Sequence, residues 1–193
     1  MIRIHSIDFM IRKSPGLRPK LIREYCFLQL RILCEIIGLG CLVCHGDIHA
    51  TKTKSLQKTW NPTEILSRMQ ELHPDFYPVP VVPVFGIGSI YLDEYKNDYL
   101  RKEDLISLWS KSGDHLHKGN FRSLLKSADT SSLRIDDIVN WNQKVINLLE
   151  NHKISRVGNL FHFIVNINHS VHTADLVKFT INVAIAEAPE ILN

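Results

Sequence analysis

Residues 19–45 read PKLIREYCFLQLRILCEIIGLGCLVCH, and this stretch decides the fold class. Its apolar residues recur at helical spacing in a wide stripe, which predicts one long helix. Charges at Arg23, Glu24, Arg31 and Glu35 interrupt the apolar run, so we expect a helix of a soluble protein and no membrane partner. The apolar positions of the stripe are Leu21, Tyr25, Leu28, Ile32, Cys34, Ile36, Leu39, Leu42 and Val43.

Further helices are expected after this stretch. The clearest start signal is Asn61-Pro62-Thr63-Glu64, in which Asn61 can cap a helix and Pro62 fits its first position. This helix should run to about residue 73, and the prolines that follow it predict an extended connection. Apolar spacing and turn signals predict a short strand pair within residues 81–91 and helices at about 102–111, 120–128 and 133–152.

The pattern changes near the C-terminus. Apolar residues alternate with others from Phe161 to Ile167 and again from Phe179 to Ile185, which is the period of a strand. Residues 169–175 link the two runs, and this length suits a hairpin with a longer loop. The sequence therefore predicts an α+β fold, mainly a helical bundle with a C-terminal antiparallel β-hairpin. The expected organisation is a basic N-terminal arm (1–18), a helical domain (19–152) and a β-hairpin packed on the helical domain (153–193).

Composition and charge set only broad limits on function. The chain of 193 residues carries a formal net charge of +3, which permits a nucleic-acid partner without requiring one. Basic residues concentrate in the first two dozen positions, where Arg12 and Lys13 are candidates for contact with phosphates. No secretory signal is recognisable in the sequence, so we expect a cytoplasmic protein with reduced cysteines.

The pentapeptide Cys41-Leu42-Val43-Cys44-His45 matches a short haem-attachment pattern. A small metal- or haem-binding protein that uses Cys41, Cys44 and His45 is therefore one hypothesis. Zinc is the alternative to haem at this segment, because thiols and imidazoles are the ligands that zinc prefers. However, no second cysteine pair follows in the sequence. The cysteines also lie close to one helical stripe, as small core residues would. We favour this structural interpretation and expect no metal and no cofactor.

Residues 109–120 read WSKSGDHLHKGN and place a cation, an acid and an imidazole at a helix end. The segment from Lys111 to His117 resembles the Arg-then-His motif of HEPN domains, which are helical, nucleotide- or RNA-associated modules, with lysine in place of arginine. Upstream, Arg31 and Glu35 resemble the Arg-x-x-x-Glu element of an early helix in some of these domains. Residues four apart share one face of a helix. The resemblance covers roughly residues 19–152.

The resemblance implies a metal-independent RNase, or an RNA-binding relative that does not cleave. In such an enzyme His117 would be the general acid or base, and Lys111 or Arg122 would stabilise the charge that develops on the phosphate. Arg31 and Glu35 would orient the site. The expected nucleic-acid contacts are Arg122, Lys118, Arg12 and Lys13.

Two other interpretations compete with a nuclease. The chain could be a non-enzymatic interaction module that forms a homo-oligomer through the long helix and the exposed edge of the hairpin. In the plainest interpretation, Arg31 and Glu35 form an ordinary pair on a helix surface, which contributes only tenths of a kcal/mol. The sequence contains no phosphate-binding loop of the Walker type, nucleophile elbow, zinc-protease helix or kinase signature.

Overall fold

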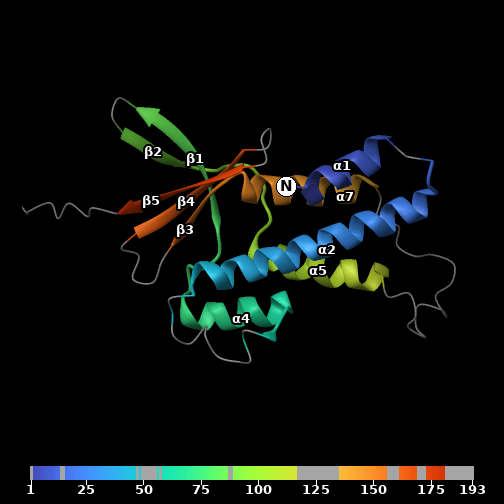
Figure 1. Ribbon diagram of the computed structural model, residues 1–193, viewed down its shortest axis with the longest axis horizontal. Coiled ribbons are helices and arrows are strands. Elements are labelled where there is room, and N and C mark those ends of the chain that lie inside the picture. Colours follow the sequence, from blue (N-terminus) through green and yellow to red (C-terminus); the bar gives the residue numbers. More distant parts are fainter. Residues whose placement is uncertain are drawn as a thin grey trace, which may run out of the picture.

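The computed structural model describes residues 2–13, 16–46, 48, 56, 58–86, 89–116, 135–155, 161–168 and 173–180. In this part of the chain, the helices pack together and an antiparallel sheet extends to one side of them (Figure 1). The helices are α1 (Ile2–Lys13), α2 (Pro19–Cys44), α4 (Pro62–Leu72), α5 (Lys102–Leu116) and α7 (Ile135–Leu149). The strands are β1 (Val79–Gly86), β2 (Ser89–Glu94), β3 (Asn151–Ser155), β4 (Phe161–Asn168) and β5 (Thr173–Thr180). The predicted α+β class and mainly helical content are confirmed.

Helix α2 runs through the middle of the helical part and contacts α1, α4, α5 and α7 (Figure 1). Pro19 lies in its first turn, where a missing N–H costs no hydrogen bond. Gly38 lets α4 approach closely, because a Cβ at this position would lie 3.2 Å from the Cβ of Pro62. By length and hydropathy α2 could also cross a membrane, although 50% of its most apolar window is buried inside the protein.

The face that α2 buries differs from the stripe that its spacing picks out. Of that stripe Cys34 is buried. The side chains of Leu21, Leu28, Ile36, Leu39 and Val43 are instead exposed. Because α2 is apolar on most sides, periodicity predicts the helix without choosing its buried side. The apolar residues that α2 does bury are Ile22, Cys26, Phe27, Leu30, Leu33, Cys34, Ile37 and Cys41.

The sheet has five strands in the order β2-β1-β3-β4-β5. Strands β4 and β5 pair antiparallel along their whole length, which confirms the predicted C-terminal hairpin. Strands β1 and β2 also pair antiparallel and confirm the strand pair expected near residues 81–91. Strand β3 joins the two hairpins, since it pairs fully with β4 but meets β1 only through His152 and Lys153. A lone hairpin is marginally stable, and β3 supplies the further strand that it requires.

The N-terminal segment corrects the prediction of a basic arm. Residues 2–13 form α1, whose Ile4 and Ile7 are buried in the core. Nδ2 of Asn142 in α7 donates a 3.1 Å hydrogen bond to Oδ1 of Asp8 in α1. Arg12 and Lys13 occupy the last turn of α1, where cations are favourable beside the carbonyl end of a helix. Charge alone suggested an arm, but two buried isoleucines one turn apart hold this segment as a helix.

Several element boundaries differ from the sequence prediction. Helix α5 continues to Leu116, beyond the expected end near residue 111. Helix α7 ends at Leu149, before the expected end near residue 152, and the chain enters β3 at Asn151. Strand β5 begins at Thr173, earlier than its alternation suggested. The helix predicted at 120–128 and the end of the second alternating run lie outside the described residues.

Candidate functional site

The predicted pair of Arg31 and Glu35 is formed on α2. Nε of Arg31 lies 3.3 Å from Oε1 of Glu35, and the two side chains are 15% and 22% exposed. The contact follows from the sequence spacing, because residues four apart are neighbours on a helix surface. Partial exposure keeps both groups within reach of a ligand in the solvent.

Trp109 of α5 joins this pair from the neighbouring helix. Its indole Nε1 donates a 3.0 Å hydrogen bond to Oε1 of Glu35, and Cζ of Arg31 lies 4.4 Å from its ring centroid. The exposed Trp60 meets Trp109 edge to face, with 6.3 Å between the ring centroids. We call Arg31, Glu35, Trp60 and Trp109 the Arg31 cluster. A guanidinium that is both stacked and ion-paired has a fixed orientation, which suits recognition of a phosphate.

Gly113 of α5 makes room for the guanidinium of Arg31. A Cβ added at Gly113 would collide with Nη1 of Arg31. The neighbouring Ser112 is also buried, and its Oγ has no hydrogen-bond partner among the residues that the structure describes. Helix α5 ends at Leu116, immediately before His117 in the sequence. Arg31 therefore lies against the last turn of α5.

Lys111 lies apart from the Arg31 cluster. Its Nζ is 5.7 Å from the ring centroid of Trp141 in α7. Successive residues of a helix turn by about 100°, so Trp109 and Lys111 leave α5 in nearly opposite directions. The structure thus brings Arg31 and Glu35 together, and places Lys111 on the side of α5 that faces α7.

A second lysine shares the ring of Trp141. Nζ of Lys144 lies 5.1 Å from the ring centroid and forms an ion pair of 2.8 Å with Oδ2 of Asp98. The hydrogen bond from Lys144 lowers the pKa of the Asp98 carboxyl and raises the pKa of Lys144. Asp104 also lies 3.5 Å from the Lys144 ammonium. The two carboxylates balance the charge of Lys144, so this side of α5 is less cationic than its lysines suggest.

Of the other residues predicted to act on or contact RNA, the structure describes only some. Arg12 and Lys13 are exposed at the end of α1. His117, Lys118 and Arg122 lie outside the described residues. Nearby, the ring of His115 stacks on Phe27 of α2, with 4.4 Å between centroids and an angle of 11°, so this imidazole packs between the helices.

The segment that resembled a haem or zinc motif forms a buried polar link. Nδ1 of His45 lies 2.8 Å from the carbonyl oxygen of Cys41, and its Nε2 lies 3.0 Å from that of Ser155. Nε2 of His73 donates to the same Ser155 carbonyl at 3.0 Å, and the two imidazole rings are 5.2 Å apart. We call His45, His73 and these two carbonyls the His45 node. It ties the ends of α2 and α4 to the end of β3.

The His45 node offers a metal little to bind. Burial raises the pKa of the Cys41 thiol far above its usual value, which disfavours the thiolate that binds metals. Both ring nitrogens of His45 already face carbonyl oxygens. Among the described residues, no group of three or more potential metal ligands comes together. This geometry favours the structural interpretation of Cys41 and His45.

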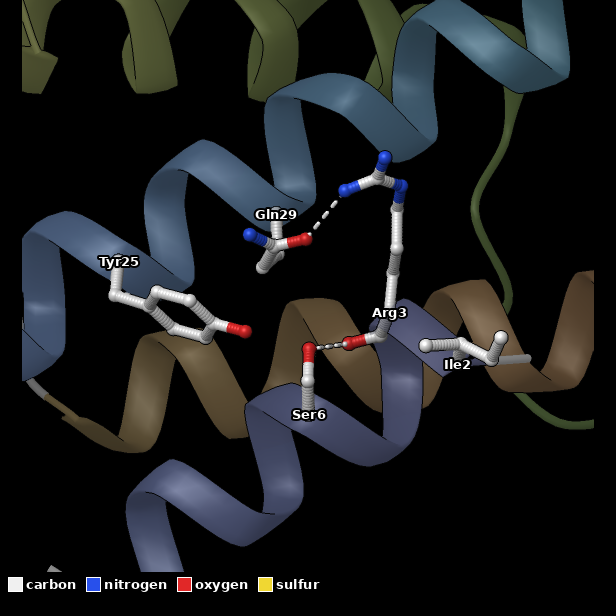
Figure 2. Close-up of a pocket in the computed structure, with 5 residues that line it drawn as sticks. All are labelled: Ile2, Arg3, Ser6, Tyr25 and Gln29. Carbon is white, nitrogen blue, oxygen red and sulfur yellow. Dashed lines mark hydrogen bonds between the residues drawn. The ribbon is translucent and has the colours of Figure 1, made fainter. Parts of the chain in front are cut away.

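An open hollow of about 380 Å³ lies between α1 and α2 (Figure 2). Nη1 of Arg3 donates a 2.6 Å hydrogen bond to Oε1 of Gln29, and the Ser6 hydroxyl donates to the Arg3 carbonyl at 2.7 Å. Figure 2 shows the ring of Tyr25 beside these groups, with Ile2 at the far end. The hollow faces α1, whereas the Arg31 cluster faces α5, so the two are separate features of α2.

Comparison of the chain with family models, with curated proteins and with solved structures finds no match. The candidate site therefore depends on its own geometry. Sequence reasoning found Arg31 and Glu35 but missed Trp109 and Gly113 as their partners. Trp109 and Gly113 are four residues apart and therefore share one face of the helix. This spacing is the sequence feature that could have indicated that both contact the same neighbour.

Proposed function

We propose that this protein is a HEPN-like, RNA-binding protein that cleaves RNA without a metal ion. The site would lie where the Arg31 cluster meets the end of α5. Arg31 would contact the RNA phosphate, Glu35 and Trp109 would hold its guanidinium in place, and His117 would transfer protons. Lys118, Arg122, Arg12 and Lys13 would add phosphate contacts that do not depend on base sequence.

The observation that carries the proposal is the contact between Arg31 and Gly113. Their segments are far apart in the sequence, and each resembles a HEPN element. In the fold, the Arg31 guanidinium lies where a Gly113 side chain would be, and Gly113 precedes His117 by four residues in the sequence. Lys111 faces Trp141 instead. We therefore assign the phosphate-stabilising role to Arg31 and leave Lys111 as a more distant cation.

The chemistry follows from these groups. An imidazole titrates near neutral pH, so His117 could take the proton from a ribose 2′-hydroxyl. The 2′-oxygen would then attack the phosphorus, and the 5′-oxygen would leave and take up a proton. Arg31 can donate parallel hydrogen bonds to two phosphate oxygens, which stabilises the charge that develops there.

The test is RNA cleavage in the presence of EDTA. Wild-type protein should cleave a labelled single-stranded RNA, and His117→Ala should abolish cleavage without weakening binding by a comparable factor. His5→Ala is the matched control, because His5 is an exposed histidine on α1, and it should cleave as wild type does.

Other results discriminate between versions of the proposal. RNA binding without cleavage in the wild type would contradict the nuclease and leave an RNA-binding relative. Neither cleavage nor binding at low salt, where phosphate contacts are strongest, would contradict the whole proposal.

A further inference from the structure

A stripe of apolar side chains runs along the outer side of α2. It lies between the side that packs against α1, which includes Gln29, and the side that packs against α5, which includes Arg31. Five members of the stripe are between 38% and 77% exposed. Tyr25 and Ile32 are partly buried. We define the outer stripe as Leu21, Tyr25, Leu28, Ile32, Ile36, Leu39 and Val43.

The residue spacing of the outer stripe is the same whether it is read from its N-terminal or its C-terminal end. Its members are separated by 4, 3, 4, 4, 3 and 4 residues, so Ile32 lies at the centre. A second α2 that runs antiparallel, with its own Ile32 at the same level, would place Leu21 opposite Val43 and Leu28 opposite Ile36. From this symmetry we propose that the outer stripe binds a second copy of this chain about a two-fold axis at Ile32. A two-fold contact requires one surface that is complementary to itself.

The same spacing favours a helix as the occupant of the stripe. Steps of 4, 3 and 4 residues make an 11-residue repeat, which keeps an apolar seam aligned along a packed helix. The seam extends for about 33 Å at the rise of an α-helix. A membrane suits this surface less well, because Arg31 and Glu35 border the stripe and 50% of the apolar window of α2 is already buried.

The proposed dimer has a consequence for the Arg31 cluster. Positions 31 and 35 lie within about one helical turn of Ile32, on the side of α2 that faces α5. A two-fold axis brings the same side of both helices together, so the Arg31–Glu35 pairs of the two copies would border one continuous surface. Dimer formation does not depend on RNA, and the two proposals can fail separately.

Sedimentation velocity of the full chain without RNA, over a series of protein concentrations, tests the dimer. Wild type should sediment as a dimer. Leu28→Glu should raise the dissociation constant by roughly 100-fold or more, because each interface would bury two unpaired carboxylates. The Leu28→Glu, Ile36→Lys double variant should restore the dimer, since position 28 faces position 36 of the other copy. Val139→Glu is the matched control on α7, where Val139 is 48% exposed, and it should remain dimeric.

Circular dichroism would check that each variant folds. A wild-type chain that stays monomeric at every concentration would overturn the proposal. A double variant that stays monomeric although it folds would contradict the antiparallel register. Binding of wild type to phosphatidylcholine vesicles, lost in Leu28→Glu, would assign the outer stripe to a membrane and overturn the dimer. A dimer that does not bind RNA would contradict only the proposed function.

Discussion

Helix α2 carries two polar groups of different character. Near its middle, the Arg31 cluster is charged and partly exposed, and its bonds join side chains of α2 and α5. At its C-terminal end, the His45 node is enclosed, and its imidazoles bond to the backbone carbonyls of Cys41 in α2 itself and of Ser155 in β3. A side chain in contact with solvent can exchange a partner for a ligand, whereas an enclosed one holds the fold.

The comparison shows why residue type alone is a weak guide to function. Cys41, Cys44 and His45 match a known ligand pattern more closely than Arg31 and Glu35 match theirs. Burial removes Cys41 and His45 from reach, whereas Arg31 and Glu35 remain partly exposed beside α5.

The largest effect should come from the enclosed group. His45→Ala should lower the free energy of unfolding by about 3 kcal/mol, because it leaves a cavity and unpaired buried groups. Arg31→Gln should lower it by less than about 1 kcal/mol, as is usual for a partly exposed ion pair. Urea denaturation would measure both variants. Equal losses would contradict the distinction between the two groups.

Two glycines on neighbouring helices test the close contact of Arg31. Gly40→Ala should stabilise the protein by roughly 0.5–1 kcal/mol, because a Cβ there meets nothing within 4 Å. Gly113→Ala should instead push aside the Arg31 guanidinium, which is the end of a flexible side chain, so its gain should be smaller by up to about 1 kcal/mol. Trp109 fluorescence should change only in Gly113→Ala. Unchanged Trp109 fluorescence in Gly113→Ala would show that Arg31 does not lie over Gly113.

A smaller, pH-dependent effect is expected in the sheet. Burial lowers the pKa of His152 in β3, despite the opposing contribution of its contact with the Leu149 carbonyl. The unfolded chain therefore takes up a proton near pH 6.5, before the folded chain does. Stability should decline as the pH falls through this value. His152→Gln should flatten the decline in urea titrations, whereas His5→Gln should not; parallel slopes in both would contradict the assignment.

The fold was predictable where local signals agree with packing. Asn61 caps α4 through a 2.9 Å hydrogen bond from the Thr63 N–H, and Pro62 begins that helix, as their sequence indicated. The alternation after Phe161 likewise predicted β4. Helix α1 was not predicted, because its many basic residues outweighed the signal of two buried isoleucines. Strand β3 was not predicted, because it has only five residues directly after a long helix, too few to show a clear strand period.

The candidate site was predictable only along one helix. The spacing of Arg31 and Glu35 indicates their ion pair directly, since both lie on α2. Their contacts with Trp109 and Gly113 depend on how α5 packs against α2, which no local pattern encodes. For the same reason the spacing within residues 109–117 suggested that Lys111 joins the site, while the rotation of α5 turns it towards Trp141.

The central claim is that the Arg31 cluster contacts RNA. Fluorescence anisotropy with a labelled single-stranded RNA, in EDTA and over a salt series, tests it most directly. Arg101→Gln is the matched control, because Arg101 also lies over an aromatic ring, 5.7 Å from Tyr99, at the other end of α5. Arg31→Gln should weaken binding roughly 10-fold and reduce the salt slope by about 1, while Arg101→Gln stays near wild type. Equal affinities for Arg31→Gln and wild type would contradict the claim.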